Sequence, residues 1–236
     1  MIETINISKR FGRLQALNNI SLSLNKGECI ALIGPNGCGK TTLIKSILGM
    51  VLPDAGDIIF DGKNIKGDNL YRSHIGYMPQ IGRYPENMSI GQIIDLIRYI
   101  RNSNEPLDSD LYEQFKISSM TDKKMRTLSG GTIQKISATL AFMFNPKVLI
   151  LDEPTAGLDP IASEMLKEKI IAARESGKLI LITSHLLSEL EEIVNGIIFM
   201  QDGMVKLHSS TEELKKKTGQ ETISKSIIQL LKNEQV

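Results

Sequence analysis

The residues best suited to chemistry form a glycine-rich stretch, GPNGCGKTT, which runs from Gly34 to Thr42. It matches the phosphate-loop pattern, in which glycines let successive backbone N–H groups turn inward around phosphate oxygens. Lys40 can reach the β- and γ-phosphates of a nucleotide, and the hydroxyl of Thr41 can ligate Mg²⁺. The stretch lies between an apolar run, CIALI, and a run with helical spacing, TLIKSILGM, as the motif requires. This context favours a nucleotide site over an ordinary glycine turn before a helix.

Two adjacent carboxylates follow a second apolar run, VLIL. Asp152 ends the expected strand, where it can hold Mg²⁺ through water. Glu153 follows it, and a carboxylate at this place can polarise an attacking water molecule. An acidic pair at a strand end is common on protein surfaces, but beside a phosphate loop the catalytic interpretation is favoured.

A second glycine turn occurs in TLSGGTIQK, between Thr127 and Lys135. Ser129, Gly130 and Gly131 supply a hydroxyl and free N–H groups at the expected start of a helix, which is a ready anion site. A side chain there would keep the backbone from approaching a phosphate. The chain therefore holds two turns suited to phosphate, far apart in the sequence.

The elements that position these residues alternate between strands and helices. ISLSL alternates as a strand with one wet face, whereas CIALI, IGYMPQ (ending at Gln80), KVLILD and KLILIT are apolar enough for strands buried on both faces. PIASEMLKEKIIAARESG predicts a helix opened by Pro160 and closed by Gly177, and GIIFMQDGMVKLH predicts a hairpin. Residues 85–145 show helical spacing and no strand signal. This order predicts an α/β fold with a mainly parallel sheet.

Composition excludes several classes of protein. The chain has 236 residues with 28 Lys+Arg and 27 Asp+Glu, a formal net charge of +1, so we expect no nucleic-acid partner. Its two cysteines show neither metal-ligand spacing nor a disulfide framework. The N-terminus lacks an apolar signal segment, and the longest apolar runs are too short to cross a bilayer. We expect a soluble, cytosolic chain.

Taken together, the motifs resemble those of the ATP-binding-cassette (ABC) ATPases. GPNGCGKTT, Gln80, LSGG, LILDEP, AGLD and ITSH occur in that family's order and span nearly the whole chain. The resemblance implies a P-loop NTPase with a RecA-like core (residues 1–84 and 146–208), an N-terminal antiparallel β part, an inserted helical subdomain (85–145) and a short tail (209–236). It also implies ATP and Mg²⁺ as ligands and a homodimer that sandwiches two ATP molecules. The second glycine turn then serves the nucleotide bound by the other subunit.

The family's site residues carry over to matching positions. Those implied to bind the nucleotide are Phe11, Gly34, Pro35, Asn36, Gly37, Cys38, Gly39, Lys40, Thr41, Thr42 and Asp152. Those implied in catalysis are Glu153, His185 and Gln80, and those near Mg²⁺ are Thr41, Gln80 and Asp152. Those implied to act on the partner's ATP are Ser129, Gly130, Gly131 and Asp159.

Three of these residues also have plainer interpretations, and one position departs from the family. Gln80 could simply end a strand, an aromatic such as Phe11 is more often part of a core, and a lone histidine such as His185 is usually structural. The family usually places Gln after the two glycines, where this chain has Thr132. Thr132 is too short to reach the sugar across the dimer, but it removes nothing from the phosphate contacts.

The resemblance implies an ATPase that drives a separate integral membrane permease from the cytoplasmic face of the inner membrane. The short tail is similar to ATPases of ABC-2 type exporters, and Thr132 with PTAGLDPIASEMLKEKI is similar to the ATPase that serves copper-site maturation of nitrous oxide reductase. The alternative is a non-transport cassette in DNA repair or translation. Such members carry coiled-coil insertions or tandem cassettes, which this chain lacks. A P-loop kinase would not explain LSGG.

Overall fold

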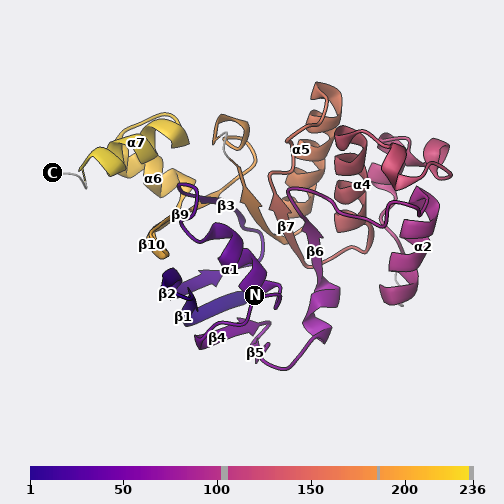
Figure 1. The fold of residues 1–236 in the computed structure, drawn as a ribbon. Helices are drawn as coiled ribbons and strands as arrows, with labels where there is room; N and C mark the ends of the chain where they lie inside the picture. Colours follow the sequence, from indigo (N-terminus) through magenta and orange to yellow (C-terminus); the bar gives the residue numbers. More distant parts are fainter. Residues whose placement is uncertain (102–105, 185–186, 234–236) are drawn as a thin grey trace. The chain divides into compact units, whose positions relative to one another are not determined.

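The computed structural model describes residues 1–101, 106–184 and 187–233, and its helices and strands are labelled in Figure 1. The chain divides into two units. The first joins Met1–Tyr71 to Leu179–Val236, and the second is Arg72–Lys178. No helix within the described ranges is long and apolar enough to cross a membrane.

The first unit contains an antiparallel sheet in the strand order β2-β1-β4-β5. Its strands are β1 (Ile2–Phe11), β2 (Leu14–Leu24), β4 (Ala55–Phe60) and β5 (Lys63–Asn64). Along β2, buried and exposed residues alternate from Ile20 onward, because successive side chains point to opposite faces. The predicted antiparallel part at the N-terminus is therefore confirmed.

The first unit also holds strands of a second, mainly parallel sheet, in the order β10-β9-β3-β8. These are β3 (Cys29–Ile33), β8 (Leu179–Thr183), β9 (Gly196–Gln201) and β10 (Met204–Ser210). β3 pairs in parallel with both β8 and β9, and every residue of β3 and β8 is buried. Burial on both faces is what the apolar runs CIALI and KLILIT predicted. β10 returns antiparallel to β9, as expected for a hairpin.

Short helices complete the first unit. They are α1 (Lys40–Ile47), the 3₁₀ turn η4 (Leu187–Glu189), α6 (Thr211–Thr218) and α7 (Ile223–Asn233), with η1 (Leu70–His74) at the boundary between the units. α6 begins with a capping box: the Ser210 side chain accepts from the Glu213 N–H, and the Glu213 carboxylate accepts from the Ser210 N–H. Beyond the β9–β10 hairpin, the short tail therefore folds as the two helices α6 and α7.

The second unit contains two parallel strands, β6 (Ile75–Met78) and β7 (Val148–Asp152), and is otherwise helical. Its helices are α2 (Ile90–Arg101), α3 (Asp110–Gln114), η2 (Ile117–Met120), η3 (Met125–Thr127), α4 (Gly130–Met143) and α5 (Pro160–Glu175). The predicted α/β class with an inserted helical part is confirmed. Helix α5 begins at Pro160 as expected, with Asp159 as its N-cap.

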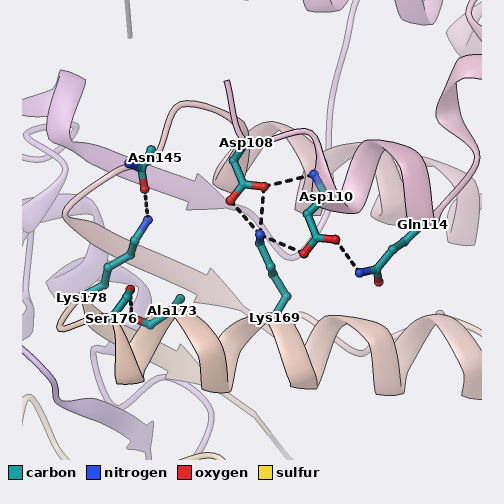
Figure 2. Close-up of polar contacts among 8 residues, drawn as sticks. All are labelled: Asp108, Asp110, Gln114, Asn145, Lys169, Ala173, Ser176 and Lys178. Atoms are coloured by element: carbon teal, nitrogen blue, oxygen red, sulfur yellow. Dashed lines mark hydrogen bonds and ion pairs between the residues drawn. The ribbon is translucent and has the colours of Figure 1, made fainter. Parts of the chain in front are cut away.

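Close contacts hold the helices of the second unit in place. α4 lies against β6 so closely that a Cβ at Gly76 would stand 2.0 Å from the Ala141 carbonyl oxygen. Figure 2 shows Lys169 of α5 beside the start of α3, where its ammonium lies 2.7 Å from Asp108 and 3.0 Å from Asp110. Burial lowers the pKa of Lys169, but the bonds to Asp108 and Asp110 outweigh this and leave it raised. The lysine therefore stays charged and ties α3 to α5.

Candidate active site

The phosphate loop follows β3 in the first unit, and two of its glycines are required by the backbone. Gly34 and Gly39 have φ values of 147° and 107°. A Cβ at Gly34 would stand 2.1 Å from the Met200 carbonyl oxygen, and one at Gly39 would stand 2.4 Å from that of Ala16. Any larger residue would collide with neighbouring main chain, so the loop keeps its path only with glycine here.

Helix α1 begins directly after this loop with features that suit an anion. Its N-cap is Gly39, which makes no side-chain capping bond, and its first turn contains no acidic residue. The Lys40 ammonium donates to the carbonyl oxygens of Gly34 at 2.7 Å and Pro35 at 3.1 Å. Thr41 is exposed, so its hydroxyl is accessible. The first N–H groups of α1 and the Lys40 charge therefore favour a phosphate at this end.

The two carboxylates lie at the end of β7 in the second unit. The strand is buried from Val148 to Leu151, and Asp152 and Glu153 are both half-buried. Burial raises the pKa of Tyr77 on β6, and the negative charge of Asp152 raises it further. Carboxylate oxygens are ligands that Mg²⁺ accepts, so Asp152 has the chemistry of a magnesium ligand.

Gln80 lies beside Glu153. Its Nε2 donates to the Glu153 Oε1 at 2.8 Å. The expectation that Gln80 ends strand β6 was wrong, because β6 ends at Met78 and Gln80 is exposed in the segment beyond it. Because it lies beyond the end of β6, the Gln80 side chain can reach the Glu153 carboxylate, which directly follows β7. Glu153 itself has a positive φ of 53°, an uncommon backbone conformation for glutamate.

The second glycine turn begins helix α4. Ser129 is the N-cap: its hydroxyl accepts from the Thr132 N–H at 3.3 Å and lies 2.9 Å from the Thr132 hydroxyl. The two glycines differ. A Cβ at Gly131 would stand 2.7 Å from the Gly157 carbonyl oxygen, whereas one at Gly130 would meet nothing within 4 Å among the described residues. The fold of the second unit thus requires glycine at Gly131, but not at Gly130.

Asp159 follows the Ala-Gly-Leu turn and is held within its own chain. One carboxylate oxygen accepts from the Ala162 N–H at 3.0 Å, and the other lies 2.6 Å from the Lys135 ammonium. The hydrogen bond from Lys135 holds the pKa of Asp159 below its usual range, and the Ala162 N–H lowers it further. The aspartate therefore remains ionised.

Two remaining predicted residues lie apart from these groups. Phe11 ends β1, and its side chain is 48% exposed, with the Lys9 ammonium 5.4 Å from the ring centroid. The ammonium lies over one face of the ring, and the exposed part of the ring can stack on a ligand, which a core aromatic could not do. His185 lies outside the described residues.

Two further residues of α4, Gln134 and Lys135, contact the site residues but were not predicted from the sequence motifs. Gln134 is buried, and its Nε2 donates to the Glu153 carbonyl oxygen at 3.3 Å. Lys135 pairs with Asp159 and lies 5.9 Å from the Phe115 ring centroid. Both residues follow the two glycines by one helical turn, so they lie on α4 close to the Ser129–Gly131 segment. This spacing was the available signal, since polar residues on an otherwise buried helix need partners.

Comparison with known proteins identifies the family. The model of the family described as ABC transporter matches residues 17–156. The chain belongs to the ABC transporter family. It is 34% identical to the Nod factor export ATP-binding protein I of Burkholderia orbicola (strain AU 1054) over 207 residues, 86% of this chain and 68% of that protein. It is 32% identical to the lantibiotic transport ATP-binding protein SrtF of Streptococcus pyogenes, over 88% of this chain and 90% of that protein.

Solved structures of ABC cassettes have the same fold as this chain. An ATP-binding subunit of an ABC transporter superposes with a TM-score of 0.91 at 26% identity, covering 98% of this chain and 99% of the other. A dimeric bacterial ABC transporter cassette superposes with a TM-score of 0.78 at 23% identity, over 89% of this chain and 98% of that one, which shows a shared fold. This ABC cassette is therefore an ATPase, the ATP-binding subunit that powers a transporter.

Proposed function

We propose that the stretch Gly34–Thr42 holds the phosphates of ATP, with Lys40 on the β- and γ-phosphates. The observation that carries this proposal is the start of α1, where N–H groups without a side-chain cap follow a loop that only glycine can form. From the family resemblance, Thr41, Gln80 and Asp152 would hold Mg²⁺, and the metal would neutralise phosphate charge. Phe11 offers its exposed ring to the adenine.

We further propose that Glu153 polarises the water that attacks the γ-phosphate. The hydrogen bond from Gln80 orients its carboxylate, and a base with a fixed direction is more effective than a freely rotating one. His185 keeps its predicted role at the γ-phosphate, on the strength of the family motif.

The turn Ser129–Gly131 acts on ATP held by a second copy of the chain. No described atom of its own chain requires glycine at Gly130, so its missing side chain suits a ligand that arrives from outside. The N-terminus of α4 presents N–H groups there, as expected for a phosphate contact. Asp159 belongs to the same dimer surface.

The chain drives an integral membrane permease, which it meets at the cytoplasmic face of the membrane. We assign it to exporters of the ABC-2 type on the sequence resemblance. A relative named for Nod factor export supports an export role, and one named for lantibiotic transport supports a transport role. Service to copper-enzyme maturation remains a prediction from the sequence resemblance. The same relatives make a DNA-repair or translation cassette the less favoured alternative.

Lys40→Ala tests the proposed site, with Lys45→Ala as its matched control. Lys45 is an exposed lysine on the same helix. We expect Lys40→Ala to lower ATP turnover by at least about 100-fold, since charge at the transferring phosphate is lost, while Lys45→Ala keeps it. Unimpaired turnover in a folded Lys40→Ala protein would refute the assignment. For the transport role, co-expression with the candidate permease should move the chain into the membrane fraction.

A further inference from the structure

Two glutamine amides hold Glu153, one at its side-chain carboxylate and one at its main-chain carbonyl oxygen. Gln80 donates to its side chain at 2.8 Å, and Gln134 donates to its main-chain carbonyl oxygen at 3.3 Å. The same carbonyl also accepts from the Ala156 N–H at 3.1 Å. Because Glu153 has a φ of 53°, its peptide needs such contacts to remain in this conformation.

Gln134 is suited to fixing this peptide rather than to binding a ligand. Gln134 is only 5% exposed, and its amide donates to the Glu153 carbonyl. A buried amide that lost this partner would be left unsatisfied, so the contact is expected to persist. The direction of the peptide after Glu153 in turn sets where the carboxylate points.

Gln134 is also part of the helix that begins with the second glycine turn. Ser129 caps α4, Gly131 fits against the Gly157 carbonyl, and Gln134 follows within the next turn of the helix. Farther along, α4 fits against Gly76 of β6. The helix is therefore in contact with the loop that starts at Glu153 at two points, Gly157 and Glu153. Any shift of the turn moves both contacts together, since packed helices move as rigid bodies.

We propose that Gln134 is a positioning residue for Glu153. When the Ser129–Gly131 turn contacts ATP, α4 moves with the turn, and Gln134 transmits this movement to the catalytic base, Glu153, of the same chain. The inference rests on the proposed function, in which that turn contacts the ATP of a second copy. Closure of the dimer then sets the Glu153 carboxylate for hydrolysis. Without the Gln134 amide, ATP still binds and the dimer still closes, but the Glu153 carboxylate is not correctly oriented for hydrolysis.

The experiment compares Gln134→Met with Gln114→Met. Methionine matches the length of glutamine and fills buried space, but it cannot donate a hydrogen bond. Gln114 is an exposed glutamine of the same unit, whose amide donates to Asp110 at 2.6 Å, so its loss leaves Glu153 untouched. Each protein is assayed for ATP affinity, kcat and KM, and for dimer formation with ATP and Mg²⁺ by analytical ultracentrifugation.

We expect Gln134→Met to lower kcat by about 10- to 100-fold with ATP affinity unchanged, because a misplaced catalytic group costs this much. Its ATP-bound dimer should persist longer than that of the wild type, whereas a merely structural defect would weaken the dimer. Gln114→Met should behave as wild type. Gln134→Glu, which keeps the shape but turns an oxygen toward the carbonyl, should repeat the kcat loss.

Two results would overturn the inference. One is a wild-type kcat in both Gln134 variants, and the other is a loss of ATP binding and dimer formation in parallel with kcat. The proposed function fails separately, through normal hydrolysis by Glu153→Gln. If Glu153→Gln is inactive while both Gln134 variants turn over normally, only the role of Gln134 is refuted.

Discussion

Gly39 in the first glycine turn and Gly130 in the second are both suited to phosphate, but they are glycine for different reasons. Gly39 has a φ of 107°, and a Cβ there would collide with the Ala16 carbonyl at 2.4 Å. Gly130 begins helix α4 without a positive φ, and a Cβ there would meet no described atom within 4 Å. Gly39 is needed for folding, and we infer that Gly130 is needed for function.

The largest expected effect is a loss of folding stability when Gly39 is replaced. Gly39→Ala should lower the free energy of unfolding by about 3 kcal/mol or more, because left-handed strain adds to a main-chain collision. Gly37→Ala is the control, since Gly37 has a φ of 80° but no atom within 4 Å of a Cβ. It should cost only about 1–2 kcal/mol. Equal losses in chemical denaturation would show that the collision with Ala16 does not matter.

Gly130→Asp should leave stability almost unchanged and block turnover. An acidic residue at the start of a helix is favourable, so the free energy of unfolding should stay within about 0.5 kcal/mol. Turnover should fall by at least about 100-fold, since a carboxylate would face the γ-phosphate. ATP should still bind at the phosphate loop. Normal hydrolysis by this variant would remove the second turn from the active site.

Mixing two inactive variants tests whether the turn acts in trans. A dimer of one Lys40→Ala chain and one Gly130→Asp chain has one site in which phosphate loop and glycine turn are both intact. Part of the ATPase activity should therefore return on mixing, as measured by phosphate release. A mixture as inactive as its parents would argue for a turn that acts on its own chain's nucleotide.

The smallest effect is expected from Thr132→Gln. The Thr132 hydroxyl lies 2.9 Å from the Ser129 hydroxyl at an exposed position, so its loss should cost little. The family's usual glutamine would regain reach toward the partner's nucleotide, and turnover should stay the same or rise, by no more than about twofold. A large drop in turnover would show that the Thr132 hydroxyl contributes to the site.

Local patterns predicted the elements whose signals are local. The apolar run Cys29–Ile33 is a buried strand, and Asp159 caps a helix that begins at Pro160. The glycine turn of the phosphate loop lies between the strand and helix expected for it. These features depend on neighbours in the sequence, which the pattern contains.

Contacts between segments far apart in the sequence could not be predicted from local patterns. Gln134 meets the Glu153 carbonyl 19 residues away, and Lys135 meets Asp159 24 residues away. Neither distance follows from periodicity, because both depend on how α4 is placed against the loop after β7. Likewise, the strand expected to end at Gln80 stops at Met78, since the apolar pattern does not mark where pairing ceases.

The central claim, that the second glycine turn completes the site of another copy, is tested most directly by dimer formation in a hydrolysis-deficient background. Glu153→Gln removes the base but keeps its shape, so with ATP and Mg²⁺ it should sediment as a dimer. The double variant Glu153→Gln/Gly130→Asp should bind ATP with the same affinity and remain a monomer in analytical ultracentrifugation. A stable ATP-bound dimer of the double variant would contradict the account.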